Sequence, residues 1–300
     1  EQSNLSRKFL IAVKQGGRMV QVSDEHYITN PEAIAAFTSA RMDAGIKGLL
    51  PDLTKASKEE LQELGVKQIV YNMYVDDICA DASVPGAIPF DYNGQTWYFD
   101  GGMVGKFDSM IRSLNVYGMQ VTMVLLNGGK SPYTQDLIHP MAAGGDCPGY
   151  ALNVEDAAGT NHIKAIGAFL GQRYSGQAGH GQVDNWIVGN EVNARTSWWY
   201  TSSDSLDFNV NIYVKAFRLL YNELKSANAN VNVYNSIDQE WNRKSNPGSF
   251  LARDYLDQFN YYINREGNID WGLSYHPYNS PLYDPYAWNG PAVWVKQSVS

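Results

Sequence analysis

A carboxylate and two amides follow an apolar run in the stretch VDNWIVGNEVNAR, residues 183–195. Residues 186–188 (WIV) are typical of the buried part of a strand, and Asn190 and Glu191 come directly after it. A carboxyl group at the end of a core strand can act as a general acid when partial burial or a second carboxylate brings its pKa near the working pH. The amide of Asn190 can bind a substrate hydroxyl group.

Aromatic side chains and further polar side chains accompany this stretch. Trp199 lies shortly after Glu191, and Trp241 follows a later apolar run. Aromatic rings with a few convergent polar groups are typical of a ligand site, and together with a carboxylate they favour a glycan. The other candidate substrate-binding residues each stand near the end of an apolar run: Asn72, Asn127, Asp238, His276 and Tyr278.

Six short apolar runs, separated by amphipathic patterns, must position these side chains. The predicted strands lie near residues 46–50, 68–74, 120–127, 185–190, 231–235 and 271–276. Helices are predicted between them, among others at 30–45, 57–65, 103–117, 207–226 and 250–267. Because the runs are apolar on both faces and alternate with helices, they predict parallel strands in consecutive βα units.

Two features favour a (β/α)8 TIM-type barrel over a doubly wound sheet. No glycine-rich phosphate loop follows the first strand. In a barrel, the carboxyl ends of all strands meet at one face, where polar residues collect. Such residues end strand after strand: Asp52, Asn72, Asn127, Glu191, Asp238 and His276. Only about six βα units are evident in the 300 residues, so we expect a segment beyond residue 300 to complete the barrel.

Two hairpins stand outside this repeating pattern. KFLIAVK (8–14) and RMVQV (18–22) flank a QGG turn, which predicts an N-terminal β-hairpin. Asn93-Gly94 between aromatic-rich runs at 87–100 predicts a second hairpin with a type I′ turn. We divide the chain into an N-terminal hairpin, or the remnant of a preceding β domain, at 1–30 and the barrel at 31–300.

Composition excludes several classes of function. The formal net charge is −8, from 23 basic and 31 acidic residues without a basic stripe, which argues against nucleic acid as a partner. No apolar run has the length of a membrane span. The sequence has no HExxH motif, no P-loop and no GxSxG elbow, so we expect no metal and no cofactor.

Whether Cys79 and Cys147 pair is open, as is the oligomeric state.

The motif WIVGNEVN after the fourth strand resembles the clan A glycoside hydrolases, (β/α)8 barrels in which an Asn-Glu pair ends strand four. YHPY at 275–278 resembles the same clan, in which many members carry a His or Tyr there. The chain is similar in particular to a bacterial (β/α)8 domain family of unassigned function, through YITNPEAIA (27–35) and WIVGNEVN.

The resemblance implies that Glu191 is the general acid/base and that Asn190 binds the hydroxyl beside the scissile bond. It also implies that His276 and Tyr278 support a nucleophilic carboxylate from strand seven. A retaining glycosidase needs two carboxyl groups about 5–5.5 Å apart. The sequence departs from the pattern because no convincing seventh strand is present, so we expect the nucleophile beyond residue 300.

The predicted function is therefore a retaining glycoside hydrolase that acts on a poly- or oligosaccharide. The alternative is a non-catalytic carbohydrate-binding barrel, and a third hypothesis is a structural module. Scarce cysteine and abundant Tyr, Asn, Gly and Trp favour a secreted or cell-surface protein. Two of these residues also have structural explanations. Glu191 can cap a following helix or pair with Arg195, and His276 can be a hydrogen-bonded structural residue. Asp76 is expected in a solvated loop or helix start.

Overall fold

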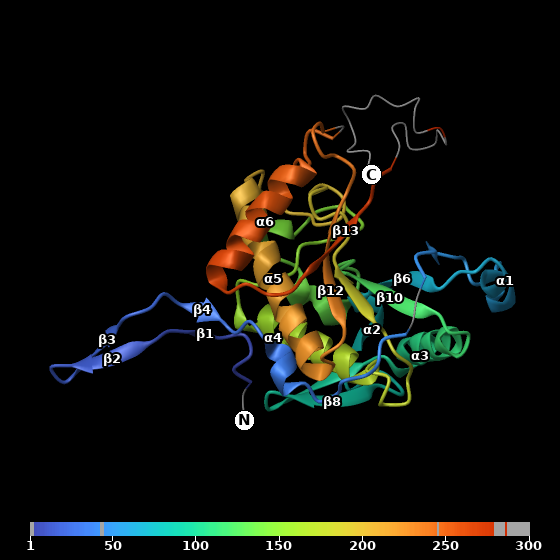
Figure 1. Cartoon of the computed structure of the whole chain (residues 1–300), viewed down its shortest axis with the longest axis horizontal. Helices are drawn as coiled ribbons and strands as arrows, with labels where there is room; N and C mark the ends of the chain where they lie inside the picture. The colour runs from blue at the N-terminus through green and yellow to red at the C-terminus, as the bar shows by residue number, and fades with distance from the viewer. Residues whose placement is uncertain (1–2, 43–44, 245, 279–285, 287–300) are drawn as a thin grey trace.

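The computed structural model describes residues 3–42, 45–244, 246–278 and 286. Within them, six strands form one parallel sheet in the order β13-β12-β11-β10-β6-β5 (Figure 1). All six predicted strands are confirmed: β5 (Gly48–Leu49), β6 (Gln68–Tyr74), β10 (Gln120–Leu126), β11 (Asn185–Val188), β12 (Asn232–Ile237) and β13 (Gly272–Tyr275). Each strand is added beside the strand before it, without the reversal that defines a doubly wound sheet. The fold is a (β/α)8-type barrel, of which the described residues form six strands.

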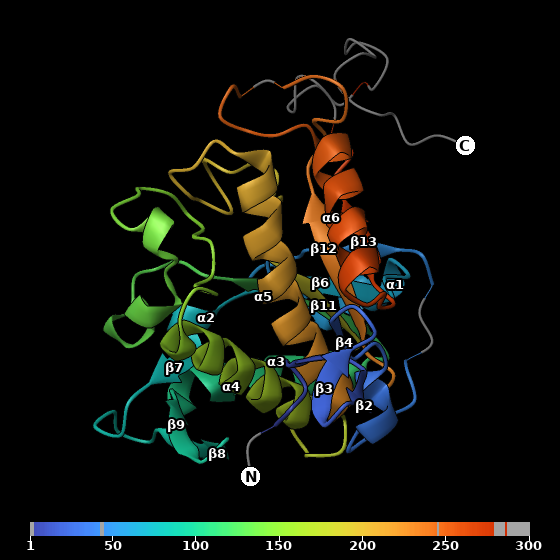
Figure 2. The same ribbon diagram turned by 90° about the vertical axis from the view of Figure 1, so that its left-hand side faces the viewer.

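Helices follow the strands and cover the outer face of the sheet (Figures 1 and 2). The longer ones are α3 (Gly101–Val116), α4 (Ala157–Arg173), α5 (Leu206–Ala227) and α6 (Ala252–Glu266). The helix predicted at 57–65 is α1 (Lys58–Glu63), and it begins with a capping box: Ser57 Oγ accepts from Glu60 N at 3.1 Å. Short elements fill the loops: α2 (Val75–Ile78) and the 3-10 turns η2 (Pro132–Leu137) and η3 (Pro140–Ala142).

The central strands β10 and β11 are buried along their whole length, which explains their continuous apolar runs. Their outward side chains, among them Met123 and Trp186, join the large core beneath the helices. The inward side chains Val124, Leu126 and Ile187 form a second, smaller cluster. Burying an apolar side chain of this size contributes about 1.5–3 kcal/mol, so the core holds the sheet on both faces.

Both predicted hairpins are confirmed. The first joins β2 (Ala12–Gln15) to β3 (Arg18–Gln21) and projects from the body of the molecule (Figure 1). The second joins β8 (Ile88–Tyr92) to β9 (Gln95–Phe99), and β7 (Cys79–Ala80) pairs with β9. Asn93 and Gly94 have φ of +52° and +82°, as a type I′ turn requires. Two short strands flank the first hairpin and pair with each other: β1 (Lys8–Phe9) and β4 (His26–Tyr27).

The helix predicted at 30–45 is wrong. Between residues 30 and 42 the chain forms one 3-10 turn, η1 (Pro31–Ile34), and the side chain of Asn30 makes no capping bond. The chain then runs alongside the end of α5, where Ala36 N and Phe37 N donate to the carbonyls of Ser226 and Ala227. These tertiary bonds use backbone groups that a continued helix would have needed, and they override local propensity.

Cys79 and Cys147 are both free. Burial first, and then the charges of Asp76 and Asp136, raises the pKa of Cys79 well above its usual value. In the described part of the chain, no helix is long and apolar enough to cross a membrane.

Candidate active site

Glu191 stands in a tight turn that follows β11, the fourth strand of the sheet. Hydrogen bonds tie this turn to both neighbouring strands: Gly189 N donates to Leu125 O at 2.9 Å, and Glu191 N donates to Ser236 Oγ at 3.1 Å. The backbone of Glu191 lies in the left-handed region, with φ of +42°. A non-glycine residue there costs about 1 kcal/mol or more, and such strain collects at functional sites.

The carboxylate of Glu191 meets a histidine from the sixth strand. Glu191 Oε1 lies 2.8 Å from His276 Nδ1, and the two side chains are 17% and 22% exposed. His276 directly follows β13, and its own N–H donates to Ile237 O at 3.0 Å. The ring of Tyr278 packs edge-on against His276 at 5.7 Å. Burial first, and then the charge of Glu191, raises the pKa of Tyr278.

Asp238, directly after the fifth strand, braces the loop that carries Asn193. It is 5% exposed, and Asn193 holds it from both sides. Asn193 Nδ2 donates to Asp238 Oδ1 at 2.7 Å, and Asp238 N donates to Asn193 Oδ1 at 3.0 Å. Burial first raises the pKa of Asp238, to about 6, with smaller contributions from the charges of Glu240 and Glu191. Asp238 is thus a buried residue whose pKa is raised mainly by burial.

We expect Asn193→Ala to lower the free energy of unfolding by about 2–4 kcal/mol, because it strands a buried carboxylate and the carbonyl of Phe250, which also accepts from Asn193. Urea unfolding followed by circular dichroism measures this loss. The control is Asn260→Ala at an exposed position on α6. Equal stability of the two variants would contradict the bracing role.

Two predicted site residues are covered by the protein. Trp199 is 2% exposed and packs edge-on against Tyr213, so it belongs to the core and not to a sugar platform. Asn127 is buried, and its Nδ2 donates to Leu137 O at 3.1 Å, so it shapes the loop after β10. Both corrections have the same cause: the polar or aromatic side chain turns into the protein and is covered there.

Two further predicted site residues are Asn72, within β6, and Trp241, after β12. Asn72 does not end its strand: it is an exposed residue within β6, paired across the ladder with Val124 on the inner face. Trp241 packs edge-on against Tyr275 of β13, with ring centroids 5.9 Å apart. Asn190 is half-buried beside Glu191, and its side chain makes no hydrogen bond to any residue that the structure describes. Its amide is available to a ligand.

Glu191 neither caps a helix nor pairs with Arg195, the two structural explanations that the sequence allowed. No helix starts at Glu191, and Arg195 donates instead to the carbonyls of Gly248 and Thr201. Asp76 lies in the first turn of α2, so the predicted helix start is confirmed, but it is not solvated. It is buried and accepts from the N–H groups of Gly128 and Lys130, at 2.7 Å each.

The sequence did not indicate the bracing role of Asn193 or the part that Ser236 takes in the turn. Asn193 lies in the polar cluster GNEVN, which was a usable signal, but its partner is 45 residues away. Trp198, rather than Trp199, packs against the inner cluster of Val124, Leu126 and Ile187. The candidate site itself consists of Glu191, His276 and Asn190, with Tyr278 packed against His276. Among the described residues, no group of three His, Cys, Asp or Glu side chains could hold a metal ion.

Fold and site together define a (β/α)8-type barrel with a histidine-bound carboxylate at the carboxyl ends of its strands. The chain belongs to a family of unknown function (DUF5722), whose model matches residues 39–300. The motif at 27–35 lies outside that match. No curated protein matches the chain significantly.

Several solved structures are similar to the chain at low identity. A fungal β-1,4-galactanase is 12% identical with a TM-score of 0.46, over 79% of this chain and 65% of that one. A family 1 β-glucosidase from Thermotoga maritima is 12% identical with a TM-score of 0.44, over 76% and 54%. A β-1,4-D-mannanase from Cryptopygus antarcticus is 11% identical with a TM-score of 0.43, over 97% and 83%. The chain thus spans about two thirds of the galactanase and half of the glucosidase.

Proposed function

We propose that this protein is a glycoside hydrolase with Glu191 as its general acid/base. One observation carries the proposal: a partly exposed carboxylate after the fourth consecutive parallel strand is bound at 2.8 Å by a histidine after the sixth. The carboxyl ends of barrel strands are where enzymes of this architecture carry their catalytic groups. A secreted or cell-surface location and an oligo- or polysaccharide substrate belong to the same proposal.

In the proposed reaction, Glu191 protonates the departing glycosidic oxygen and later activates a water molecule. Asn190 binds a sugar hydroxyl beside the scissile bond. The nucleophile is a second carboxylate that we expect on a seventh strand, about 5–5.5 Å from Glu191, as retention of configuration requires. Asp238 is not suited to this role, because it is buried and held by Asn193. His276 contacts Glu191 and therefore orients the acid/base.

The alternative is a carbohydrate-binding barrel without catalysis. The burial of Asp238 favours it, because a buried carboxylate held by Asn193 does not reach a bound sugar as a nucleophile must. A panel of aryl glycosides and polysaccharides separates the two functions. Hydrolysis with retained anomeric configuration, followed by proton NMR, supports the hydrolase. Binding of an oligosaccharide without release of reducing ends supports the alternative.

We expect His276→Ala to lower kcat about tenfold with little change in KM, because the loss of one hydrogen bond frees the Glu191 side chain. His276→Asn, whose amide can still donate, should retain more of the activity. Steady-state kinetics on the glycoside that the wild-type protein hydrolyses fastest tests both. A KM effect with unchanged kcat would instead place His276 in substrate binding.

A further inference from the structure

The strands β11 and β12 separate at their carboxyl ends, next to Glu191. β11 pairs with β10 as far as Val188, but its pairing with β12 ends one residue earlier, at Ile187 and Tyr234. β12 continues to Ile237 and stays paired with β13 to its end. The ladder between β11 and β12 is therefore open at the point from which the turn of Glu191 departs.

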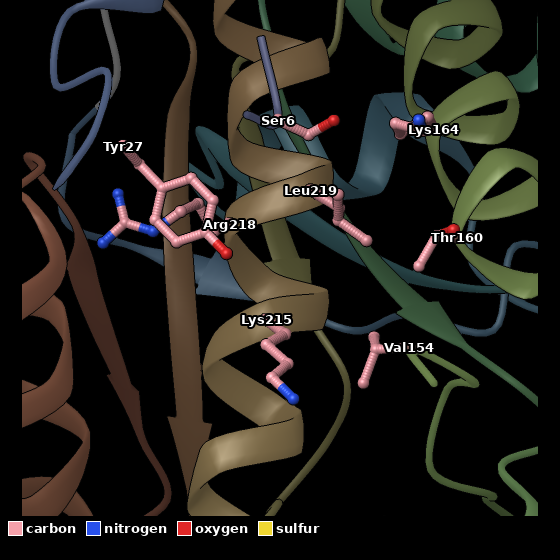
Figure 3. A pocket seen from close by; sticks show the side chains of 8 residues that line it. All are labelled: Ser6, Tyr27, Val154, Thr160, Lys164, Lys215, Arg218 and Leu219. Atoms are coloured by element: carbon pink, nitrogen blue, oxygen red, sulfur yellow. The ribbon is translucent and has the colours of Figure 1, made fainter. Parts of the chain in front are cut away.

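The helix α5 places the hydroxyl group of Tyr213 in this opening. Lys215 and Arg218 lie on the other side of α5, where they line a separate pocket of about 190 Å³ beside α4 (Figure 3). Tyr213 instead points at the sheet, and its Oη donates to Val188 O at 2.8 Å. Burial raises the pKa of Tyr213 well above its usual value, and a hydrogen bond from the backbone of Ser236 opposes this rise. The hydroxyl group thus lies between β11 and β12, just beyond their last paired residues.

The same opening receives the turn of Glu191. Ser236 of β12 is 0% exposed and contacts the turn twice: its Oγ accepts from Glu191 N at 3.1 Å, and its carbonyl accepts from Val192 N at 2.9 Å. The first of these bonds fixes the N–H group of the residue whose φ is +42°. A strained backbone persists only where its surroundings over-determine it, and Ser236 supplies this constraint directly.

Close packing fixes the ring of Tyr213 and so aims its hydroxyl group. Tyr213 is 0% exposed, and Trp199 packs edge-on against it with ring centroids 5.0 Å apart. The rings of Phe259 and Tyr255 lie 5.6 and 6.0 Å away. Tyr255 is equally buried, but its hydroxyl group has no hydrogen-bond partner among the described residues. The chain thus offers two tyrosines of one core, of which Tyr213 bonds to a strand of the candidate site.

We propose that Tyr213 and Ser236 are positioning residues of the candidate site. Their hydroxyl groups keep the ends of β11 and β12 apart and fix the turn of Glu191, so that Glu191 Oε1 meets His276 Nδ1 at 2.8 Å. Both residues are fully buried, so they act through Glu191 and not on a substrate. Their effect on catalysis rests on the proposed function, whereas their effect on the turn does not.

Hydrogen exchange of the Glu191 amide, followed by NMR, tests the effect on the turn in the absence of any substrate. Ser236→Ala removes the acceptor of this amide, and Tyr213→Phe removes the group between the strands. We expect exchange to be about tenfold faster in both variants, because local opening becomes easier. Ser236→Thr, which keeps the oxygen atom, should restore slow exchange. The matched control is Tyr255→Phe, which removes a hydroxyl group from the same core and should exchange like the wild type.

Wild-type exchange in both Ser236→Ala and Tyr213→Phe would overturn the proposal. Faster exchange in Tyr255→Phe as well would also overturn it, because the effect would then come from loosening of the core.

Kinetics with two leaving groups test the effect on catalysis. Ser236→Ala and Tyr213→Phe should each lower kcat for an oligosaccharide about tenfold with little change in KM, since the misplaced group is the acid/base. Release of dinitrophenol from a dinitrophenyl glycoside in the first turnover should keep its wild-type rate, because this leaving group departs without protonation. Ser236→Thr should recover most of the oligosaccharide activity, and Tyr255→Phe should keep it.

The two experiments separate the inference from the proposed function. Equal losses on both substrates would overturn the positioning role, because they indicate a general defect of the site. A wild-type protein that hydrolyses no glycoside would overturn the proposed function alone, and faster exchange in Ser236→Ala and Tyr213→Phe would still support their control of the turn.

Discussion

Under the proposed function, Glu191→Gln should lower the kcat for an unactivated glycoside by about 10²- to 10⁴-fold, the range that general acid–base catalysis contributes. The amide has the size of the carboxyl group and can still bond His276, which now lies 2.8 Å from Oε1, so the fold is retained. It cannot protonate the departing oxygen or deprotonate water. Steady-state hydrolysis of an oligosaccharide by the complete protein measures the loss.

The leaving group makes this experiment specific for an acid/base role. A dinitrophenyl glycoside departs without protonation, so Glu191→Gln should cleave it in a burst and then stall at the covalent intermediate. Azide should restore turnover and yield a glycosyl azide of retained configuration. The control is Asn190→Ala, which should weaken hydrolysis of both substrates without a burst. Near-normal hydrolysis of the oligosaccharide by Glu191→Gln would sink the proposed function.

Glu223→Gln should make the protein more stable at pH 8 by up to about 3 kcal/mol and equally stable at pH 4. Glu223 is buried between α5 and the second hairpin, where it accepts the hydroxyl of Tyr92 at 2.5 Å. Burial is the largest cause that raises its pKa, from 4.5 to about 7. The amide oxygen can accept the same hydroxyl without the cost of burying a charge.

The sign of the pH effect follows from where the proton is bound. Between pH 4.5 and 7 the folded protein holds a proton on Glu223 that the unfolded chain has released. The wild type therefore loses stability as pH rises through this window, and the loss is complete above pH 7. Urea unfolding at pH 4.5, 6 and 8 measures the slope. Glu63→Gln, at an exposed position on α1, is the control and should keep the wild-type slope. A wild-type slope in Glu223→Gln would contradict the prediction.

The sheet could be predicted because its signals are local. Runs such as residues 120–126 are apolar on both faces, Gly or Asn-Gly marks the turns, and Ser57 with Glu60 marks a helix start. The segment after Pro31 could not be predicted. Its helix signals are equally local, but the end of α5 takes the backbone bonds of Ala36 and Phe37.

The candidate site also has parts that could be predicted from the sequence and parts that could not. Glu191 was predictable because a carboxylate directly after a core strand is visible in the sequence. The partner of His276 was not, since the bond to Glu191 joins residues that only the barrel brings together. The side-chain directions of Trp198 and Trp199 were also inaccessible, because an irregular loop has no periodicity from which to assign a face.

The left-handed backbone of Glu191 makes it possible to infer selection at this position from the residues that related chains carry there. Glycine, or asparagine, would adopt φ of +42° more easily than glutamate does, so drift toward either residue relieves strain. A relative that keeps glutamate here does so against the preference of its own backbone, which indicates selection for chemistry. A relative with glycine should be the more thermostable protein and, under the proposed function, an inactive one.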